Sequence, residues 1–126
     1  MIEKLSIIIP AYNEGRTIHL ILNKVKEVNL INNITKEVII VNDCSTDETE
    51  SIIENYIEAN PSFNIQYFKH DINMGKGAAL HTGISKATGQ YLILQDADLE
   101  YDPQEYNDLL KPVVNGFADV VYGSRF

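Results

Sequence analysis

The sequence predicts an α/β domain with a mostly parallel sheet and helices on both of its faces. Short apolar runs alternate with amphipathic stretches along the chain, which is typical of strands joined by helical crossovers. Three of the runs, at residues 7–9, 38–41 and 92–94, are apolar without interruption. Uninterrupted runs indicate strands that are buried on both faces, as the strands of a parallel sheet are. We therefore expect a doubly wound sheet.

Five strands are expected, each rich in β-branched or aromatic residues and bounded by turn-forming residues. They span residues 5–10, 37–42, 64–69, 91–95 and 119–123. Pro10 has no N–H to donate to a sheet ladder, so the first strand should end at this residue.

Two helices are expected in the first half of the chain. At residues 18–28 the apolar side chains fall at helical spacing on one face, and the polar ones are turned elsewhere. The second helix should follow Ser45, because Ser45 and Glu48 have the spacing of a capping box.

Two more helices are expected in the second half. The third should occupy residues 76–87, with Gly89 as its stop. The fourth should begin after Asp102, with Pro103 at the first helical position and Glu105 completing a second capping box. Pro112 lacks the N–H of a helical hydrogen bond and should end or kink this helix.

The composition is that of one globular domain, with 126 residues of which 44% are hydrophobic and 22% charged. The formal charge of −8 argues against a nucleic-acid partner, because proteins that bind nucleic acids are basic where they make contact. Cys44 is the only cysteine, so no internal disulfide is expected and a reducing, cytoplasmic setting is favoured. No run approaches the roughly 18 apolar residues of a membrane span.

Polar side chains with binding chemistry follow the first two strands, at the edge where open parallel sheets bind ligands. Tyr12 could pack on a nucleotide base and Glu14 could accept a hydrogen bond from its N–H. An ordinary strand-to-helix turn capped by Asn13 explains the same residues. Asp43 could accept from a base or a ribose, and a plain polar turn is equally consistent with it.

A glycine-rich turn, Gly75-Lys76-Gly77, precedes the third expected helix. It is not a P-loop, because Lys76 is followed by glycine rather than serine or threonine, and it lacks the final glycine of a dinucleotide fingerprint. A turn into a helix N-terminus can nevertheless hold an anion. A structural turn and a ligand contact both remain open for these residues.

The densest local signal follows the fourth strand, where Asp96, Asp98, Glu100 and Asp102 place four carboxylates within seven residues. These groups would repel one another without a cation. Hard oxygen ligands at a strand end suit Mg²⁺ or Mn²⁺, which keep positions for water and phosphate. The alternative is a solvated acidic turn with Asp102 as a helix cap.

The remaining candidate side chains give weaker signals. His19, His70 and His81 do not have the spacing of metal ligands and are interpreted as structural or surface residues. Arg125 follows the last expected strand, where it is either a surface residue or a phosphate contact.

In order along the chain, residues 9–14, 42–47, 73–77, 96–98 and 123–125 resemble the N-terminal nucleotide-sugar domain of the inverting family 2 glycosyltransferases. The resemblance covers essentially the whole chain and implies the GT-A fold, a Rossmann-like sheet with helices on both faces. Residues 75–79 and 96–99 are most similar to the dolichol-phosphate mannosyltransferase, or polyprenyl-phosphate glycosyltransferase, branch. We expect residues 1–126 to be the N-terminal part of such a domain, truncated at its C-terminus.

The resemblance implies which residues bind a GDP- or UDP-linked sugar. These are Pro10, Ala11, Tyr12, Glu14, Val41, Asp43, Lys76, Asp96, Ala97, Asp98 and Arg125. Asp96 and Asp98 would hold Mg²⁺ or Mn²⁺ against the diphosphate, with Glu100 as a further ligand where the branch often has glutamine. The chain departs from the family at Asn42, where an aspartate is common.

The implied reaction is a single displacement at the anomeric carbon of the sugar, through an oxocarbenium-like transition state. The implied acceptor is a polyprenyl phosphate or, as the alternative, a saccharide hydroxyl in cell-envelope polysaccharide synthesis. No catalytic base is assigned, because a hydroxyl acceptor would take its base from a C-terminal half beyond Phe126. Membrane association through such segments, at the cytoplasmic face, is also implied.

Two other classes are weaker alternatives. A nucleotidyltransferase would have a glycine-rich, basic loop after the first strand, where this chain has residues 10–14. A receiver-like signalling module, which is not an enzyme, would have paired acids after the first strand and a lone aspartate after the third. Here the paired acids follow the fourth strand, and the third ends at Lys69-His70-Asp71.

Overall fold

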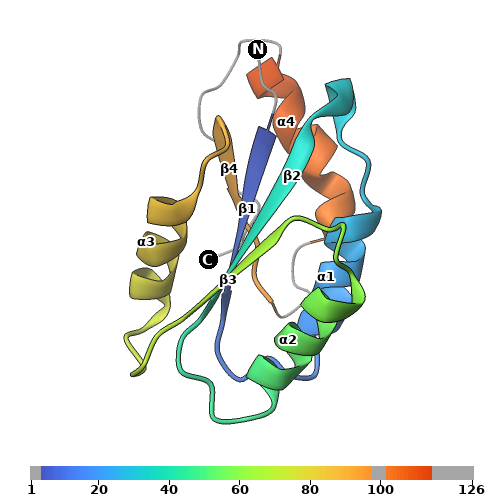
Figure 1. The fold of residues 1–126 in the computed structure, drawn as a ribbon. Coiled ribbons are helices and arrows are strands. Elements are labelled where there is room, and N and C mark those ends of the chain that lie inside the picture. Colours follow the sequence, from blue (N-terminus) through green and yellow to red (C-terminus); the bar gives the residue numbers. More distant parts are fainter. Residues whose placement is uncertain (1–3, 98–101, 115–126) are drawn as a thin grey trace.

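The computed structural model describes residues 4–97 and 102–114 of the chain and confirms the α/β architecture. Four strands form one sheet in the order β3-β2-β1-β4, and every neighbouring pair is parallel (Figure 1). Their bounds are β1 Lys4–Ala11, β2 Thr35–Asn42, β3 Ile65–Lys69 and β4 Tyr91–Leu94. The strand expected at residues 119–123 lies outside the described residues.

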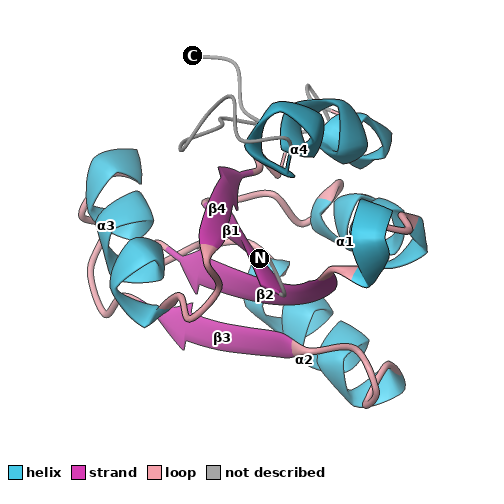
Figure 2. Ribbon diagram, turned by 90° about the horizontal axis from the view of Figure 1, so that it is seen from above, coloured by secondary structure: helices cyan, strands magenta, loops and turns pink. Residues whose placement is uncertain are grey.

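The helices are divided unequally between the two faces of the sheet. Figure 2 shows one helix, α3, on one face, and α1, α2 and α4 together on the other. The α-helices are α1 Ile18–Glu27, α2 Thr49–Ala59, α3 Lys76–Lys86 and α4 Tyr106–Val114; short 3₁₀ turns are η1 Ile31–Asn33 and η2 Pro103–Glu105. In the part of the chain that the structure describes, no helix has the length and hydropathy needed to cross a membrane.

Two hydrophobic layers explain the uninterrupted apolar runs. Ile7 and Ile9 belong to the layer beneath α1, α2 and α4, whereas Ile8 between them belongs to the layer beneath α3. All three are completely buried. Because successive strand side chains point to opposite faces, a strand covered on both sides must be apolar at every position. Each such burial contributes roughly 1.5–3 kcal/mol to folding.

The register brings the carboxyl ends of the strands together. β1 and β2 pair residue by residue from Lys4↔Thr35 to Ala11↔Asn42, so the two strands end side by side. β1 runs one residue past Pro10, contrary to the expected end, and the Ala11 carbonyl accepts a hydrogen bond from the Asp43 N–H at 2.9 Å. The loops that follow β1 and β2 therefore start as neighbours.

Two expected helix boundaries are wrong in detail. Helix α2 begins at Thr49, and the capping box is not formed because the Ser45 hydroxyl bonds Asn42 and the Asn13 N–H instead. Of the two outcomes expected at Pro112, an end or a kink, the end is wrong, because helix α4 extends to Val114. Proline removes only one helical hydrogen bond, and buried Leu110 packs the preceding turn into the core.

Gly89 does not stop α3 by capping it, since the helix ends at Lys86 with Ala87 in an extended conformation. Gly89 instead packs against the first strand, where its N–H donates to the Ser6 hydroxyl at 2.8 Å. A Cβ at this position would lie 2.7 Å from the Ser6 Oγ and 2.8 Å from the Lys4 carbonyl oxygen. The glycine is therefore required by the close approach of two backbones.

A buried carboxylate, that of Glu37, stabilises the end of the sheet at which Gly89 packs. This end lies opposite the carboxyl edge, where the functional site is expected. Glu37 is 2% exposed and accepts hydrogen bonds from the Ser6 hydroxyl and from both the N–H and the hydroxyl of Thr88. Burial alone would raise the pKa of the Glu37 carboxyl, but these bonds from Thr88 and Ser6, with the Lys4 ammonium 3.5 Å away, lower the pKa below its ordinary value.

Glu37→Gln should therefore cost about 1–3 kcal/mol of unfolding free energy at pH 7, because an amide cannot accept from all the donors that surround Glu37. A lowered pKa stabilises the fold above the unfolded-state value of about 4.3, and this contribution disappears as the pH falls through the folded-state value. Urea denaturation at pH 7 and below pH 4 should show the difference between wild type and variant shrinking in acid. Glu54→Gln, at an exposed position of α2, is the control. A stability difference between wild type and Glu37→Gln that is the same at both pH values would contradict an ionised Glu37 with a lowered pKa.

Candidate functional site

A pocket of about 380 Å³ opens at the carboxyl edge of the sheet. It is lined by Pro10, Ala11, Tyr12, Glu14, Asp43, Asn73, Gly75, Lys76, Ala79, Asp96 and Ala97. These residues come from the ends of β1, β2 and β4 and from the start of α3, which is the edge at which open parallel sheets bind ligands.

The pocket contains most of the residues that the sequence singled out, although their binding roles stay predictions. Val41 does not line it: this side chain is completely buried in the layer beneath α3. Asp98, Glu100 and Arg125 lie outside the described residues. Asn73, Gly75 and Ala79 also line the pocket but were not among the predicted binding residues, although Asn73 and Gly75 lie in the same glycine-rich motif as Lys76.

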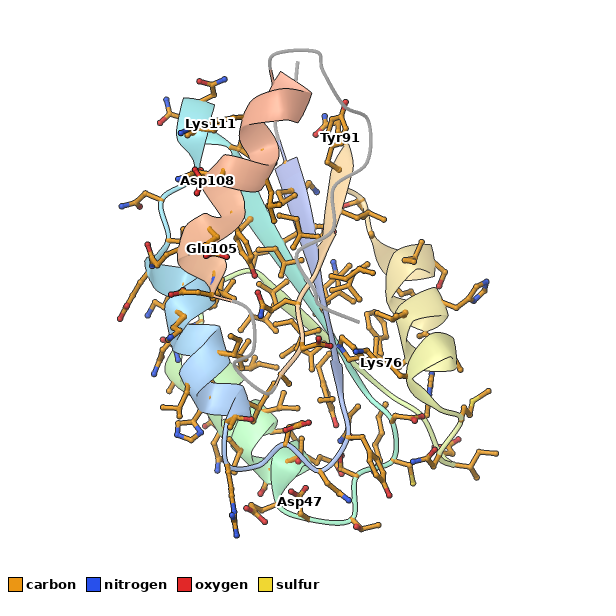
Figure 3. The ribbon with its side chains drawn as sticks, turned by 180° about the vertical axis from the view of Figure 1, so that it is seen from behind. Asp47, Lys76, Tyr91, Glu105, Asp108 and Lys111 are labelled. Atoms are coloured by element: carbon orange, nitrogen blue, oxygen red, sulfur yellow. The ribbon has the colours of Figure 1, made fainter. Side chains whose placement is uncertain are left out.

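Lys76 and Asp96 meet in this pocket. The Lys76 Nζ lies 2.5 Å from the Asp96 Oδ1. Figure 3 shows Lys76 at the start of α3, beside the carboxyl edge of the sheet. Gly75 precedes it with φ +93°, a conformation that favours glycine, and so directs the first residue of α3 toward the sheet. The arrangement places a cation and an anion within reach of the same ligand.

The turn that carries Asp96 is fixed from two sides. The buried Tyr106 hydroxyl of α4 donates to the Gln95 Oε1 at 2.6 Å. On the other side the Thr17 hydroxyl lies 2.5 Å from the Ala97 carbonyl oxygen and 3.3 Å from a carboxylate oxygen of Glu14. Thr17 therefore joins the acidic turn to the loop that carries Glu14.

Asp43 anchors the loop between β3 and α3. Its two carboxylate oxygens accept the N–H groups of Met74 at 2.9 Å and Gly75 at 2.8 Å. His70 Nδ1 lies 2.8 Å from the same carboxylate, and His70 Nε2 lies 2.9 Å from the Thr82 hydroxyl of α3. His70 is thus a structural residue, as expected, and it holds the pocket-lining Asp43 without lining the pocket itself.

These contacts also set the charge state of Asp43. Burial alone would raise the pKa of its carboxyl, but the Met74 N–H, the His70 ring and the Gly75 N–H together lower the pKa below its ordinary value. Asp43 is therefore ionised at neutral pH while 3% exposed. The sequence placed Asp43 at the site without revealing that its carboxylate binds the neighbouring loop.

The loops after β1 and β2 are joined by side chains. Asn13 has φ +53°, and its Oδ1 accepts the N–H groups of Thr46 at 2.8 Å and Asp47 at 3.3 Å. Its own N–H donates to the Ser45 hydroxyl at 2.9 Å. Asn13 therefore does not cap α1, the role that an ordinary turn would give it; it holds the backbone next to Tyr12, whose side chain is exposed at the pocket.

Asp47 and Thr49 extend this connection toward Glu14. The Glu14 N–H donates to the Thr49 hydroxyl at 2.9 Å, and the Gly15 N–H donates to an Asp47 carboxylate oxygen at 3.2 Å. Asp47 also accepts from the N–H and the hydroxyl of Thr49. The polar residues after the second strand thus position the loop that follows β1, a role that was not predicted but that follows from two adjacent strands ending together.

Of the three predicted metal ligands, Asp96 lies within the described residues. Within residues 4–97 and 102–114 no group of three or more histidine, cysteine, aspartate or glutamate side chains gathers as a metal site. Asp96 nevertheless fits a cation, because its carboxylate already holds the ammonium of Lys76 in the pocket wall. A hard divalent ion favours such an oxygen donor.

The match to known families agrees with this geometry. The model of the family described as glycosyl transferase family 2 matches residues 6–126. The chain belongs to glycosyl transferase family 2. Its sheet, with helices on both faces, is the GT-A fold of these glycosyltransferases.

Three similar proteins are informative. The dolichyl-phosphate β-glucosyltransferase of Dictyostelium discoideum is 34% identical over 129 residues, covering 96% of this chain and 39% of the relative. The mannosyltransferase PcManGT of Pyrobaculum calidifontis, solved with GDP-Man and Mn²⁺, is 29% identical with a TM-score of 0.72, covering 80% of this chain and 29% of that one. TarS 1–349 of S. aureus, solved with UDP-GlcNAc, is 26% identical with a TM-score of 0.74, covering 89% and 31%.

These family 2 relatives are longer than this chain. The chain spans between a fifth and two fifths of the length of the curated relatives that it matches first. The matched part is the one that contains the pocket at the carboxyl edge of the sheet.

Proposed function

We propose that this chain carries the donor site of a metal-dependent, inverting glycosyltransferase that moves a sugar from a nucleoside diphosphate to a polyprenyl phosphate. The observation that carries the proposal is the pocket at the carboxyl edge of the sheet, where the Lys76 ammonium and the Asp96 carboxylate meet. A nucleotide sugar bound to a divalent cation complements both groups, because its diphosphate is negative and its cation is positive.

In this proposal, different residues of the pocket bind the base, the diphosphate and the cation of the donor. Tyr12 packs on the base and Glu14 accepts from its N–H groups, at the end held by Thr49. Lys76 contacts the diphosphate, and Asp96 with Asp98 holds Mg²⁺ or Mn²⁺. The neighbour solved with GDP-Man and Mn²⁺ supports this assignment of donor and cation.

The chemistry asked of these residues is binding and orientation. A divalent cation, when bound, supplies Lewis-acid stabilisation of the departing diphosphate. Lys76 adds a positive charge next to the same leaving group, where negative charge grows as the glycosidic bond breaks. Thr17 and Tyr106 keep the Asp96 turn in place, so that little reorganisation is needed during the displacement.

The proposed acceptor is a lipid phosphate, at the cytoplasmic face of a membrane. The relative whose name contains dolichyl phosphate supports this choice. A phosphate is already ionised at neutral pH and needs no strong general base, whereas a saccharide hydroxyl needs one. Formation of a glycolipid from polyprenyl phosphate, but not of a product from free saccharide, is the expected outcome of an acceptor assay.

The donor site is tested by calorimetric titration of GDP and UDP into the chain, with Mn²⁺, with Mg²⁺ and with EDTA. We expect one of the two nucleotides to bind when a divalent cation is present and to lose most of its affinity in EDTA. ADP is the matched control for base recognition. If neither GDP nor UDP binds a chain that is folded by circular dichroism, the proposed donor site is contradicted.

A further inference from the structure

The ion pair between Lys76 and Asp96 joins one fixed and one adaptable partner. The Asp96 side chain is 10% exposed and lies in a turn held by Thr17, whereas the Lys76 side chain is 47% exposed. The backbone before Lys76 is held as well, since Asp43 accepts the N–H groups of Met74 and Gly75. A rearrangement of this pair can therefore take place through the lysine side chain while the turn that carries Asp96 stays in position.

Lys76 is also the single basic side chain among the pocket-lining residues that the structure describes. The acidic side chains of that lining are Glu14, Asp43 and Asp96, and the Asp43 carboxylate already accepts from His70 and two N–H groups. A divalent cation that approaches the Asp96 Oδ1 meets the ammonium 2.5 Å from the same oxygen. The ammonium repels a second cation at that oxygen, so cation binding there is favoured once the ammonium has moved away.

A nucleoside diphosphate provides the place to which the ammonium moves. Its phosphates carry more negative charge than one carboxylate, and Lys76 lines the same pocket on a stem of four carbons. We propose that Lys76 is an internal counter-ion: it holds Asp96 when no nucleotide is bound and moves to the diphosphate on binding, so that the nucleotide frees Asp96 for the divalent cation. This inference rests on the proposed donor site.

The proposal has a thermodynamic signature. If the nucleotide raises cation affinity through Lys76, the cation must raise nucleotide affinity through Lys76 by the same factor. Removing the ammonium should therefore strengthen cation binding without nucleotide and weaken the coupling between the two ligands. A lysine that only shaped the start of α3 would produce neither effect.

The test is titration of Mn²⁺ into the 126-residue chain, with free Mn²⁺ measured by electron paramagnetic resonance, alone and then with saturating GDP or UDP. Without nucleotide, Lys76→Met should bind Mn²⁺ about two- to fivefold more tightly than wild type, the range expected for removal of a partly exposed ion pair. Lys76→Arg, which keeps the charge, should remain close to wild type. With nucleotide, the advantage of Lys76→Met should shrink or reverse.

Two controls separate this effect from general electrostatics. Lys24→Met removes the same charge from an exposed position of α1 and should leave Mn²⁺ affinity unchanged. In an Asp96→Asn background, Lys76→Met should give no gain in Mn²⁺ affinity, because the carboxylate for which the ammonium and the cation compete is gone.

Equal or weaker Mn²⁺ binding by Lys76→Met without nucleotide, an equal gain from Lys24→Met, or no Mn²⁺ binding by any of these proteins would each overturn the counter-ion role. A gain by Lys76→Met together with no effect of GDP or UDP would support the competition for Asp96. The absence of any effect of GDP or UDP would contradict the proposed donor site. Failure of the counter-ion role and failure of the donor site therefore give different results.

Discussion

Asp96→Asn should abolish the dependence of nucleotide binding on Mn²⁺ or Mg²⁺. The substitution keeps the shape of a 10% exposed side chain but removes the charge that a hard divalent cation requires. Loss of residues that merely orient a ligand typically costs 10–100-fold in metal affinity, so loss of a ligand should cost at least about 100-fold. Titration of Mn²⁺ in the presence of saturating nucleotide measures this effect.

The matched control is Asp108→Asn. Asp108 lies on α4, as Figure 3 shows, and its side chain is 76% exposed, with Lys111 3.6 Å away. The control removes the same charge away from the pocket and should leave both affinities unchanged. Retention of wild-type, cation-dependent nucleotide binding by Asp96→Asn would show that Asp96 is not a metal ligand, and the proposed mechanism would lose its main support.

Asp43→Ala should have the largest effect on stability at the site, about 2–4 kcal/mol in the free energy of unfolding at pH 7. The substitution removes the carboxylate that accepts from the partly buried N–H groups of Met74 and Gly75 and from the His70 ring, and hydrogen bonds to a charged group contribute about 1.5–3 kcal/mol each. Nucleotide affinity should fall as well, because this loop forms one wall of the pocket. Urea denaturation and calorimetric titration on the same preparations measure the two effects.

The pH dependence identifies the carboxylate as the cause. Burial opposes ionisation, but the Met74 N–H, His70 and the Gly75 N–H lower the pKa of Asp43, so its contribution is present above the unfolded-state pKa of about 3.9 and is lost as the pH falls through the folded-state value. The stability difference between wild type and Asp43→Ala should therefore narrow below about pH 4. Asp71→Asn, at an exposed position in the same loop, is the control. If Asp43→Ala lowers the free energy of unfolding at pH 7 by less than about 0.5 kcal/mol, the loop between β3 and α3 does not depend on Asp43.

The layers of the fold were predictable because they follow from local patterns. A run such as residues 38–41, apolar at every position, has few solutions other than a strand covered on both faces. The edge of the sheet that holds the pocket followed from the rule for parallel strands, which correctly brought Tyr12, Asp43 and Asp96 together. Val41, which only the family resemblance implied, does not line the pocket, because its side chain packs in the layer beneath α3.

The contacts within the loops were not predictable, because they depend on which loops meet. Ser45 and Glu48 have the spacing of a capping box, yet the Ser45 hydroxyl is engaged by Asn13 and Asn42. Local propensity lost here to a tertiary partner 32 residues away in sequence. His70 is a similar case, since no pattern near it in the sequence indicates a bond to Asp43 across two strand ends.

The loop anchored by Asp43 also determines which substitutions it tolerates. Ile72 and Met74 are 68% and 57% exposed, so their side chains make small demands on the fold. What Met74 contributes is its N–H, which every amino acid except proline possesses. Gly75 contributes an N–H and a positive φ, a combination that few residues other than glycine supply without strain. Position 74 is thus open to almost any side chain and closed to proline, while the backbone conformation at position 75 restricts it almost entirely to glycine.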